Sequence, residues 1–467
     1  MNKCISTISC VFVAAAALAD AAIDSVEVWQ DWPWSRNVNV KVVVSGADES
    51  GVDIRLAALN ASDEIGDIPS ASLASGSLFA VKNGTSVFSF DPQTALPEST
   101  SGSYGNFRVS AEIVGVGDPF IDREEYVVFD LETGEKTSLT RREFYTHPER
   151  YGAYTKDYST VGSGFVSALA EGETFVWTGV NSNNTYKTTK LAMKRIPAAD
   201  KVWWMGPHPD DSYAVMSGTG ATVTNAVSGN SYVETRFQVR LTKDFYIGVF
   251  ELTQRQYETI MGKNPSYFTN VNYYAHPVEN IGMRSFTGDG GFCATASAKC
   301  GVTFKLPTEA QWEFAAKAGY DGPNFPNGKS RTTSNASELE GYQNYRGTTD
   351  RNTSNNGHYK VGVGRPNAYG LFNTLGNVSE RTRENVRKDL LRYYTNTRGM
   401  TQPFVNPVNN HGSEVGGDAI VYKGGYFNSA ATTKTHRPSY REGAVPHATQ
   451  NAAGCPGIYG YRVSIDL

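Results

Sequence analysis

Apolar residues alternate with polar ones along the first hundred residues, which is the pattern of half-buried β-strands. Valines recur at every second position from Val38 to Val44, and a glycine-bounded turn at 46–51 interrupts them. Further short alternating runs continue to residue 115, separated by clusters of Gly, Ser, Asp and Pro. This spacing of strands and turns predicts an antiparallel β-sandwich over residues 23–115.

Three tryptophans, Trp29, Trp32 and Trp34, stand close together between the first two expected strands. Aromatic clusters usually lie in protein cores. We therefore expect these side chains to cap the sandwich or to pack against the next domain. The alternative is an exposed platform on which sugar rings stack.

The pattern of apolar and polar residues changes after the predicted sandwich. Residues 116–190 contain one clear strand pattern, at 126–131, and we expect them to form either a connecting layer or a continuation of the sandwich. From residue 191 short strands alternate with short helices, of which 253–261 and 308–316 have the best start signals. Thr308 followed by Gln311 is a capping box. The whole chain is thus expected to be a β-rich α+β protein, its second half (191–467) having few short helices and long loops.

The N-terminus has the pattern of a secretory signal peptide over residues 1–22. Lys3 precedes an apolar stretch, and small residues at 17–19 form an A-x-A cleavage pattern. We expect export to the periplasm, the cell surface or the medium. No later segment offers the ~20 unbroken apolar residues of a membrane-spanning helix.

Charge and cysteine content exclude two classes of site. Lys and Arg number 43 against 47 Asp and Glu, a net charge of −4, so no basic footprint for nucleic acid is present. Removal of the leader leaves Cys293, Cys300 and Cys455, with no zinc-binding spacing. Cys293 and Cys300 are expected to be small buried residues, and the pairing of the three cysteines stays open.

Six motifs follow one another in a recognisable order after residue 191. They are Met193–Pro197 with Trp204–Gly206, Phe245–Tyr257, Leu306–Glu313, Pro366–Asn373 with Gly376–Glu380, Gly424–Gly425, and Gly460–Val463. In this order they make residues 191–467 resemble the formylglycine-generating enzyme (sulfatase-modifying factor) family, a variant of the C-type lectin fold. The resemblance does not cover the first 190 residues.

The resemblance implies an oxidase chemistry that this sequence does not support. Enzymes of the family oxidise a sulfatase cysteine to formylglycine with two cysteines that bind Cu(I), a soft ion suited to thiolates. Ser429 and Lys434 stand in their places, and Tyr426 and Ser379 depart from neighbouring motif positions. Copper is therefore not expected. A formylglycine-generating oxidase is the alternative reading, with Cys455 as its nearest thiol.

The favoured hypothesis is a non-catalytic protein that binds a protein or glycan ligand on the former active-site surface. Tyr, Ser and Asn combine rigid aromatic area with adaptable hydrogen bonding, as in antibody paratopes. Some proteins of this fold are diversified by retroelements, so a variable display role is a sub-hypothesis. The candidate binding residues are Tyr426, Phe427, Asn428, Thr433, His436, Arg437 and Tyr440.

A structural calcium ion is also implied by the resemblance. Its ligands would be the Asn373 side chain, the Gly376 and Val378 carbonyls and the Glu380 carboxylate, all hard oxygen donors. The alternative is that Glu380 pairs with Arg381 or Arg383. A second calcium site would use Asn344 and Tyr345. Glu309 and Glu313, one turn apart, are better explained by the helix dipole than as a catalytic pair.

Overall fold

The computed structural model describes most of the chain, with gaps. The described residues are 20–59, 64–96, 108–147, 150, 180, 183–207, 216–217, 220–224, 231–234, 236–269, 273–318, 357–364, 366–367, 369–386, 402–408, 419–427, 436–440, 442–446 and 457–467. They form two compact units. The first unit holds the described residues through Glu124 together with 140–150, and the second unit holds Glu125–Leu139 and the described residues from 180 onward. The leader expected at 1–22 lies almost wholly outside them.

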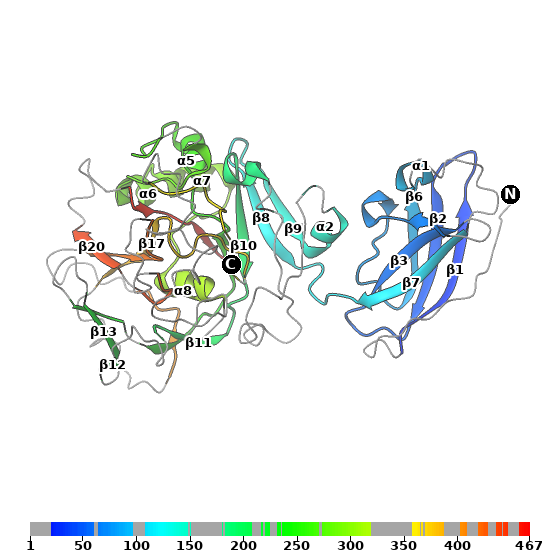
Figure 1. Ribbon diagram of the computed structural model, residues 1–467, viewed down its shortest axis with the longest axis horizontal. Coiled ribbons are helices and arrows are strands. Elements are labelled where there is room, and N and C mark those ends of the chain that lie inside the picture. The colour runs from blue at the N-terminus through cyan, green and yellow to red at the C-terminus, as the bar shows by residue number, and fades with distance from the viewer. Residues whose placement is uncertain are drawn as a thin grey trace. The chain divides into compact units, whose positions relative to one another are not determined.

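The first unit is a sandwich of two antiparallel sheets (Figure 1). The four-stranded sheet has the order β1-β2-β6-β5, and the three-stranded sheet has the order β4-β3-β7. Their strands are β1 (Ala22–Gln30), β2 (Val38–Ser45), β3 (Val52–Leu59), β4 (Glu64–Asp67), β5 (Leu73–Ser75), β6 (Gly84–Phe90) and β7 (Arg108–Val116). Alternate valines of β2 point into one core shared by both sheets. The predicted sandwich is confirmed.

Short helices complete the first unit. They are η1 (Ser70–Ser72), α1 (Pro92–Ala95) and α2 (Arg141–Thr146). Arg141 at the start of α2 forms a buried ion pair with Asp118 at 2.9 Å. Part of the stretch expected to connect the two regions therefore packs in the first unit.

The expectation that the tryptophans cap the sandwich is wrong for two of them. Trp29, at the end of β1, is half-buried, but 69% of Trp32 and 85% of Trp34 is exposed. Both stand in the turn between β1 and β2 rather than on a strand face, so the alternation that buries the valines does not reach them.

A five-stranded sheet organises the second unit, in the order β22-β16-β10-β8-β9. Its strands are β8 (Glu124–Asp130), β9 (Lys136–Thr140), β10 (Lys190–Ile196), β16 (Phe245–Gly248) and β22 (Ser464–Asp466). β8 lies in the stretch expected to be a connecting layer, yet it pairs with β10 from Lys190↔Asp130 to Lys194↔Tyr126. The sheet thus joins segments from both ends of the second unit.

Successive residues of this sheet enter two different cores, as the pleat of a strand requires. Leu191 and Met193 of β10 face a core that also contains the apolar sides of α5 (Gln254–Met261), α6 (Met283–Thr287) and α7 (Phe292–Cys300). Ile196 of the same strand faces the other core, with α8 (Glu309–Lys317). Two further 3-10 turns are η4 (Asn184–Lys187) and η5 (Tyr273–Ala275).

Both helix starts expected from the sequence are confirmed. Thr253 caps α5 and forms a reciprocal capping box with Gln256. Thr308 does the same with Gln311 at the start of α8, satisfying two backbone N–H groups that the helix leaves open.

Three smaller sheets complete the second unit, in the orders β11-β15-β18, β12-β13-β14 and β20-β19-β17-β21. Their strands are β11 (Val202–Met205), β12 (Met216–Ser217), β13 (Gly220–Thr224), β14 (Ser231–Glu234), β15 (Phe237–Arg240), β17 (Ser379–Val386), β18 (Phe404–Val405), β19 (Ala419–Lys423), β20 (Glu442–Pro446) and β21 (Tyr459–Gly460). The chain is β-rich with few short helices, as predicted. Within the described part no helix is long and apolar enough to cross a membrane.

Candidate functional site

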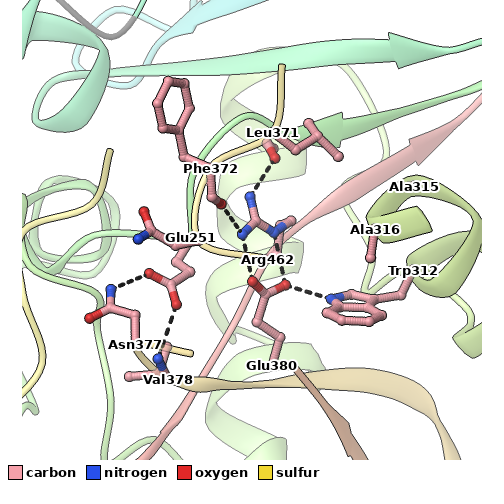
Figure 2. Close-up of polar contacts among 12 residues, drawn as sticks. Glu251, Trp312, Ala315, Ala316, Leu371, Phe372, Asn377, Val378, Glu380 and Arg462 are labelled. Atoms are coloured by element: carbon pink, nitrogen blue, oxygen red, sulfur yellow. Dashed lines mark hydrogen bonds and ion pairs between the residues drawn. The ribbon is translucent and has the colours of Figure 1, made fainter. Parts of the chain in front are cut away.

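The motifs that carry the resemblance meet around one buried arginine, Arg462 (Figure 2). Its side chain is 1% exposed and lies just before β22. Its guanidinium donates to the Glu380 carboxylate from Nε (2.8 Å) and Nη2 (2.5 Å). The remaining donors reach the carbonyls of Gly248 (2.9 Å), Val249 (3.0 Å) and Phe372 (2.8 Å). All five N–H groups of the guanidinium are thereby used.

Glu380 is the partner of Arg462 rather than of Arg381 or Arg383, the alternatives that its sequence neighbours suggested. It lies on β17 and is 1% exposed. Its Oε2 also accepts a hydrogen bond of 2.6 Å from Nε1 of Trp312, which α8 directs inward (Figure 2). A buried carboxylate with a bidentate arginine and an indole donor is fully satisfied, so its role in this structure is to fix the fold.

A second buried carboxylate, Glu251, lies beside this pair. Its oxygens accept from the Asn377 side chain at 2.5 Å and from the Val378 backbone at 3.1 Å (Figure 2). Burial and the charge of Glu380 raise the pKa of Glu251 well above its usual value, despite the opposing effect of Arg462. The hydrogen bonds of Glu251 therefore hold the loop before β17 to the segment that follows β16.

Two of the expected calcium ligands, Asn373 and Glu380, accept hydrogen bonds from the protein in this structure. Both oxygens of Glu380 face N–H donors, and Oδ1 of Asn373 accepts from the Gly362 backbone at 2.8 Å. The Gly376 N–H donates to Gly424 O. A calcium ion at these residues would have to displace protein hydrogen bonds, so the donor set fits the ion poorly. Asn344 and Tyr345, the second expected site, lie outside the described residues.

The Gly424–Gly425 motif has a steric reason. Gly424 has a φ of +90°, and a Cβ there would lie 2.9 Å from Thr374 O and 3.3 Å from the Trp312 ring. The Phe427 N–H then donates to Asn377 O at 2.9 Å, so the segment after the glycines is bonded to the loop before β17. Only glycine lets the backbone lie this close to α8.

Glu309 and Glu313 form a buried ion-pair network rather than simply complementing the helix dipole. Lys423, fully buried on β19, lies 3.4 Å from Glu309 and 3.1 Å from Glu313. Burial alone would raise the pKa of Glu313, but the charges of Lys423 and Lys317 outweigh it and lower the pKa to about 2. Nearby, burial and the charge of Glu309 raise the pKa of Glu384 to about 8. Glu309 and Glu313 are thus paired with the buried Lys423.

The predicted binding surface needs correction. Phe427, His436, Arg437 and Tyr440 are between 0% and 7% exposed, so their side chains do not form a surface for a ligand. Their aromatic and cationic groups are used inside the protein, where Phe427 packs on Phe268. Tyr426 is half-buried. The other candidates, Asn428, Thr433, Ser429 and Lys434, lie outside the part of the chain that the structure describes, and Ser379 is buried in β17.

A cluster of aromatic and histidine side chains in contact with Phe427 was not expected from the sequence. The Phe268 ring contacts both Phe427 (5.8 Å between centroids) and His358 (5.3 Å). Nδ1 of His358 lies 3.1 Å from Nδ1 of His276, and its Nε2 lies 3.7 Å from Glu279. Burial and the nearby His358 lower the pKa of His276 to about 4. Scattered histidines far apart in sequence gave no signal of this contact.

Tyr267, next to Phe268, is 74% exposed and packs edge-on against it at 5.1 Å. A Cβ on Gly457 would lie 2.5 Å from the Phe268 ring. Phe268 therefore touches the residue that precedes segment 428–435 and the residue that follows segment 447–456. Tyr267 is therefore an exposed residue next to the place where Phe427 and Gly457 approach Phe268.

The two described cysteines do not form a metal site. Cys293 and Cys300 are unpaired and buried on α7, and burial raises the pKa of Cys293 to about 12. In the described ranges no group of three or more His, Cys, Asp or Glu side chains could hold a metal ion. Cys455 lies outside those ranges.

Comparison with known proteins agrees with this assembly of motifs. The model of the sulfatase-modifying factor enzyme 1-like domain matches residues 210–456, more than half of the chain. The chain therefore belongs to the sulfatase-modifying factor family of formylglycine-generating enzymes and their relatives.

Relatives of known name share modest identity with this chain. The formylglycine-generating enzyme of Streptomyces coelicolor is 28% identical over 194 residues, 41% of this chain and 53% of that protein. The chaperone protein LppX of Paenibacillus barcinonensis is 30% identical over 174 residues, 29% of this chain and 61% of that protein. The formylglycine-generating enzyme of Thermomonospora curvata is 33% identical over 106 residues, 22% of this chain and 32% of that protein. The chain thus spans about half the length of the first two.

Among solved structures, the crystal structure of CarF matches 57% of this chain and 99% of its own at 14% identity, with a TM-score of 0.33.

Proposed function

We propose that this chain is an exported, non-catalytic member of the family that binds a protein or glycan ligand through its C-terminal region. The observation that carries the proposal is the identity of two residues after the Gly424–Gly425 motif. Ser429 and Lys434 stand where the family resemblance places the two cysteines that bind Cu(I). A hydroxyl and an ammonium cannot replace soft thiolate ligands.

The described thiols do not compensate for this loss. Cys293 and Cys300 are core residues of α7, and burial raises the pKa of both. A thiol that stays protonated is neither a good nucleophile nor a good metal ligand. Cys455 would supply only one thiolate.

The scaffold around the replaced positions supports a binding role. Arg462, Glu380 and Trp312 fix the base of the motif loops by charge-assisted bonds. Binding loops are usually positioned by a rigid scaffold of this kind. Among the described residues, Tyr267 has an exposed side chain and Tyr426 a half-buried one beside this region. Tyrosine at such positions often dominates binding energy.

The names of the relatives are compatible with both an oxidase and a non-catalytic function. Two are formylglycine-generating enzymes, which keeps the oxidase as the second candidate function. Another is named a chaperone, LppX, so the domain also occurs in a protein whose name describes no oxidation.

The deciding experiment is peptide conversion. The purified full chain is incubated with a Cys-x-Pro-x-Arg peptide, Cu(I), oxygen and a thiol reductant, and the peptide is read by mass. The S. coelicolor relative serves as the positive control. We expect an unchanged peptide from folded protein, whereas an aldehyde product lost on Cys455→Ala would establish the oxidase instead.

The binding arm uses immobilised glycans and purified extracellular proteins as probes. Tyr267→Ala and Tyr426→Ala should each weaken capture about tenfold, since truncation of an interface tyrosine commonly has this effect. Cys455→Ala should not change it. If neither tyrosine matters to any captured probe, the assignment of the binding region is wrong.

A further inference from the structure

The first unit carries an exposed aromatic feature that the proposed function does not use. The turn between β1 and β2 presents Trp32 at 69% and Trp34 at 85% exposure. Tryptophan is rarely left so open on a protein surface unless it has a partner. Two such side chains, separated by a single residue, stand in one short turn, here called the tryptophan turn (residues 31–36).

The tryptophan turn is held by a network of hydrogen bonds. The N–H groups of Trp34 and Ser35 both donate to Asp31 O, at 2.8 and 2.9 Å. Gln30 donates from its side chain to Arg36 O at 2.8 Å, and this bond closes the base of the turn. The turn is therefore ordered before any ligand arrives, which lowers the entropy lost on binding.

The same turn also contains two charged residues, Asp31 and Arg36. The Arg36 guanidinium is exposed and held by Gln93 of α1 at 3.0 Å, leaving further N–H donors open to solvent. Asp31 is exposed, and within the described chain its carboxylate has no hydrogen-bond partner. The tryptophan turn thus combines about 300 Å² of exposed aromatic surface with one donor residue and one acceptor residue.

The local charge decides among possible partners. Asp31 and Arg36 balance each other, and the neighbouring Lys41 on β2 is paired with Glu27 at 3.2 Å. There is no cationic excess to attract anionic lipid or nucleic acid, both of which depend on clustered Lys and Arg. A partner with apolar faces, a hydroxyl rim and no net charge matches the tryptophan turn better.

We propose that the tryptophan turn is a binding site for a neutral glycan. The C–H faces of pyranose rings would lie on Trp32 and Trp34, and their hydroxyls would bond to Asp31 and Arg36. The first unit would then attach the chain to a polysaccharide, independently of what the second unit binds.

The test measures retention of the full chain on insoluble cellulose, chitin and xylan, with quenching of tryptophan fluorescence by the matching hexasaccharides. The Trp32→Ala/Trp34→Ala variant should bind at least tenfold more weakly than the unaltered chain. Val114→Ala, at a 56% exposed apolar residue of β7 in the same unit, is the matched control and should bind normally. Equal melting curves confirm that all three proteins are folded.

Failure to bind any of the three polysaccharides, or equal binding by the double tryptophan variant, overturns the proposal. Neutral phosphatidylcholine vesicles are tested in parallel, and binding to them that depends on the tryptophans would assign the tryptophan turn to a lipid surface instead. Tyr426→Ala should leave polysaccharide binding intact, so this proposal and that for the second unit fail separately.

Discussion

Replacement of Glu380 by Gln tests whether the Arg462 ion pair holds the second unit together. Glutamine keeps the size of the side chain and one acceptor oxygen but leaves the buried guanidinium without its counter-charge. Removal of one partner of a buried pair usually costs about 3–5 kcal/mol. Part of this loss is offset here, because burial and the charge of Glu380 together raise the pKa of Glu251, and the variant removes the second cause.

Once Glu380 is neutral, the pKa of Glu251 should fall and its carboxylate should take over some of the charge balance of Arg462. We therefore expect a net loss of about 3 kcal/mol in the free energy of unfolding, near the lower end of the usual range. For a unit of this size that corresponds to a fall in Tm of about 4 °C.

The assay is urea unfolding followed by near-ultraviolet circular dichroism and by tryptophan fluorescence. Trp312 donates a hydrogen bond to Glu380, so its signal reports directly on the substituted site. Glu258→Gln is the matched control. It breaks the Arg255–Glu258 pair on α5, which is partly exposed, and should cost no more than about 0.5 kcal/mol.

All measurements are made in EDTA and again with CaCl₂. A loss below about 1 kcal/mol in both buffers would refute the ion-pair reasoning, because it lies outside the range for an uncompensated buried charge. A loss that occurs only with calcium present would show that Glu380 is a metal ligand, as the family resemblance implies. We expect the same loss in both.

Two further predictions concern the backbone and pH. Gly424→Ala should destabilise the second unit by about 3 kcal/mol, since its φ is +90° and the new Cβ would meet Thr374 O at 2.9 Å. The control is Gly262→Ala, at a φ of +70° with open space around it, which should cost only about 1 kcal/mol in the same urea titration. Equal losses in the two variants would contradict the steric argument. The pKa of His276 is lowered from 6.5 to about 4, so the folded state binds its proton less readily than the unfolded state, and stability present above pH 6.5 should be lost as the pH falls towards 4, by about 2–3 kcal/mol. His276→Gln should flatten this part of the stability profile measured by chemical denaturation, and an unchanged slope would remove His276 as its cause.

Features set by neighbouring residues could be predicted from the sequence. The capping boxes at Thr253 and Thr308 depend on residues three positions apart, and both are present. The alternating valines of β2 required only the pleat of a strand, and they enter the core as expected. The order of six motifs was enough to indicate the family.

Features set by distant partners could not be predicted. Arg462 and Glu380 are 82 positions apart, and nothing local favours that arginine over Arg381 or Arg383. The polar and aromatic residues Phe427, His436 and Arg437 looked like a surface because composition does not say which face of a loop is covered. Trp32 and Trp34 were expected in the core because aromatic clusters usually lie there. They are exposed because an aromatic residue in a turn has no strand face to bury it.

The position of Arg462 late in the chain has a consequence for biosynthesis. Its carbonyl acceptors at Gly248, Val249 and Phe372 precede it by 90 to 214 positions, and β22 pairs with β16 only after Arg462 has been made. The sandwich of the first unit contains none of these residues and can form while translation continues. The second unit must instead wait, its central carbonyls and Glu380 unpaired, until Arg462 and β22 have been made. Truncation before Arg462 would therefore leave a folded sandwich attached to a C-terminal region that cannot close its core.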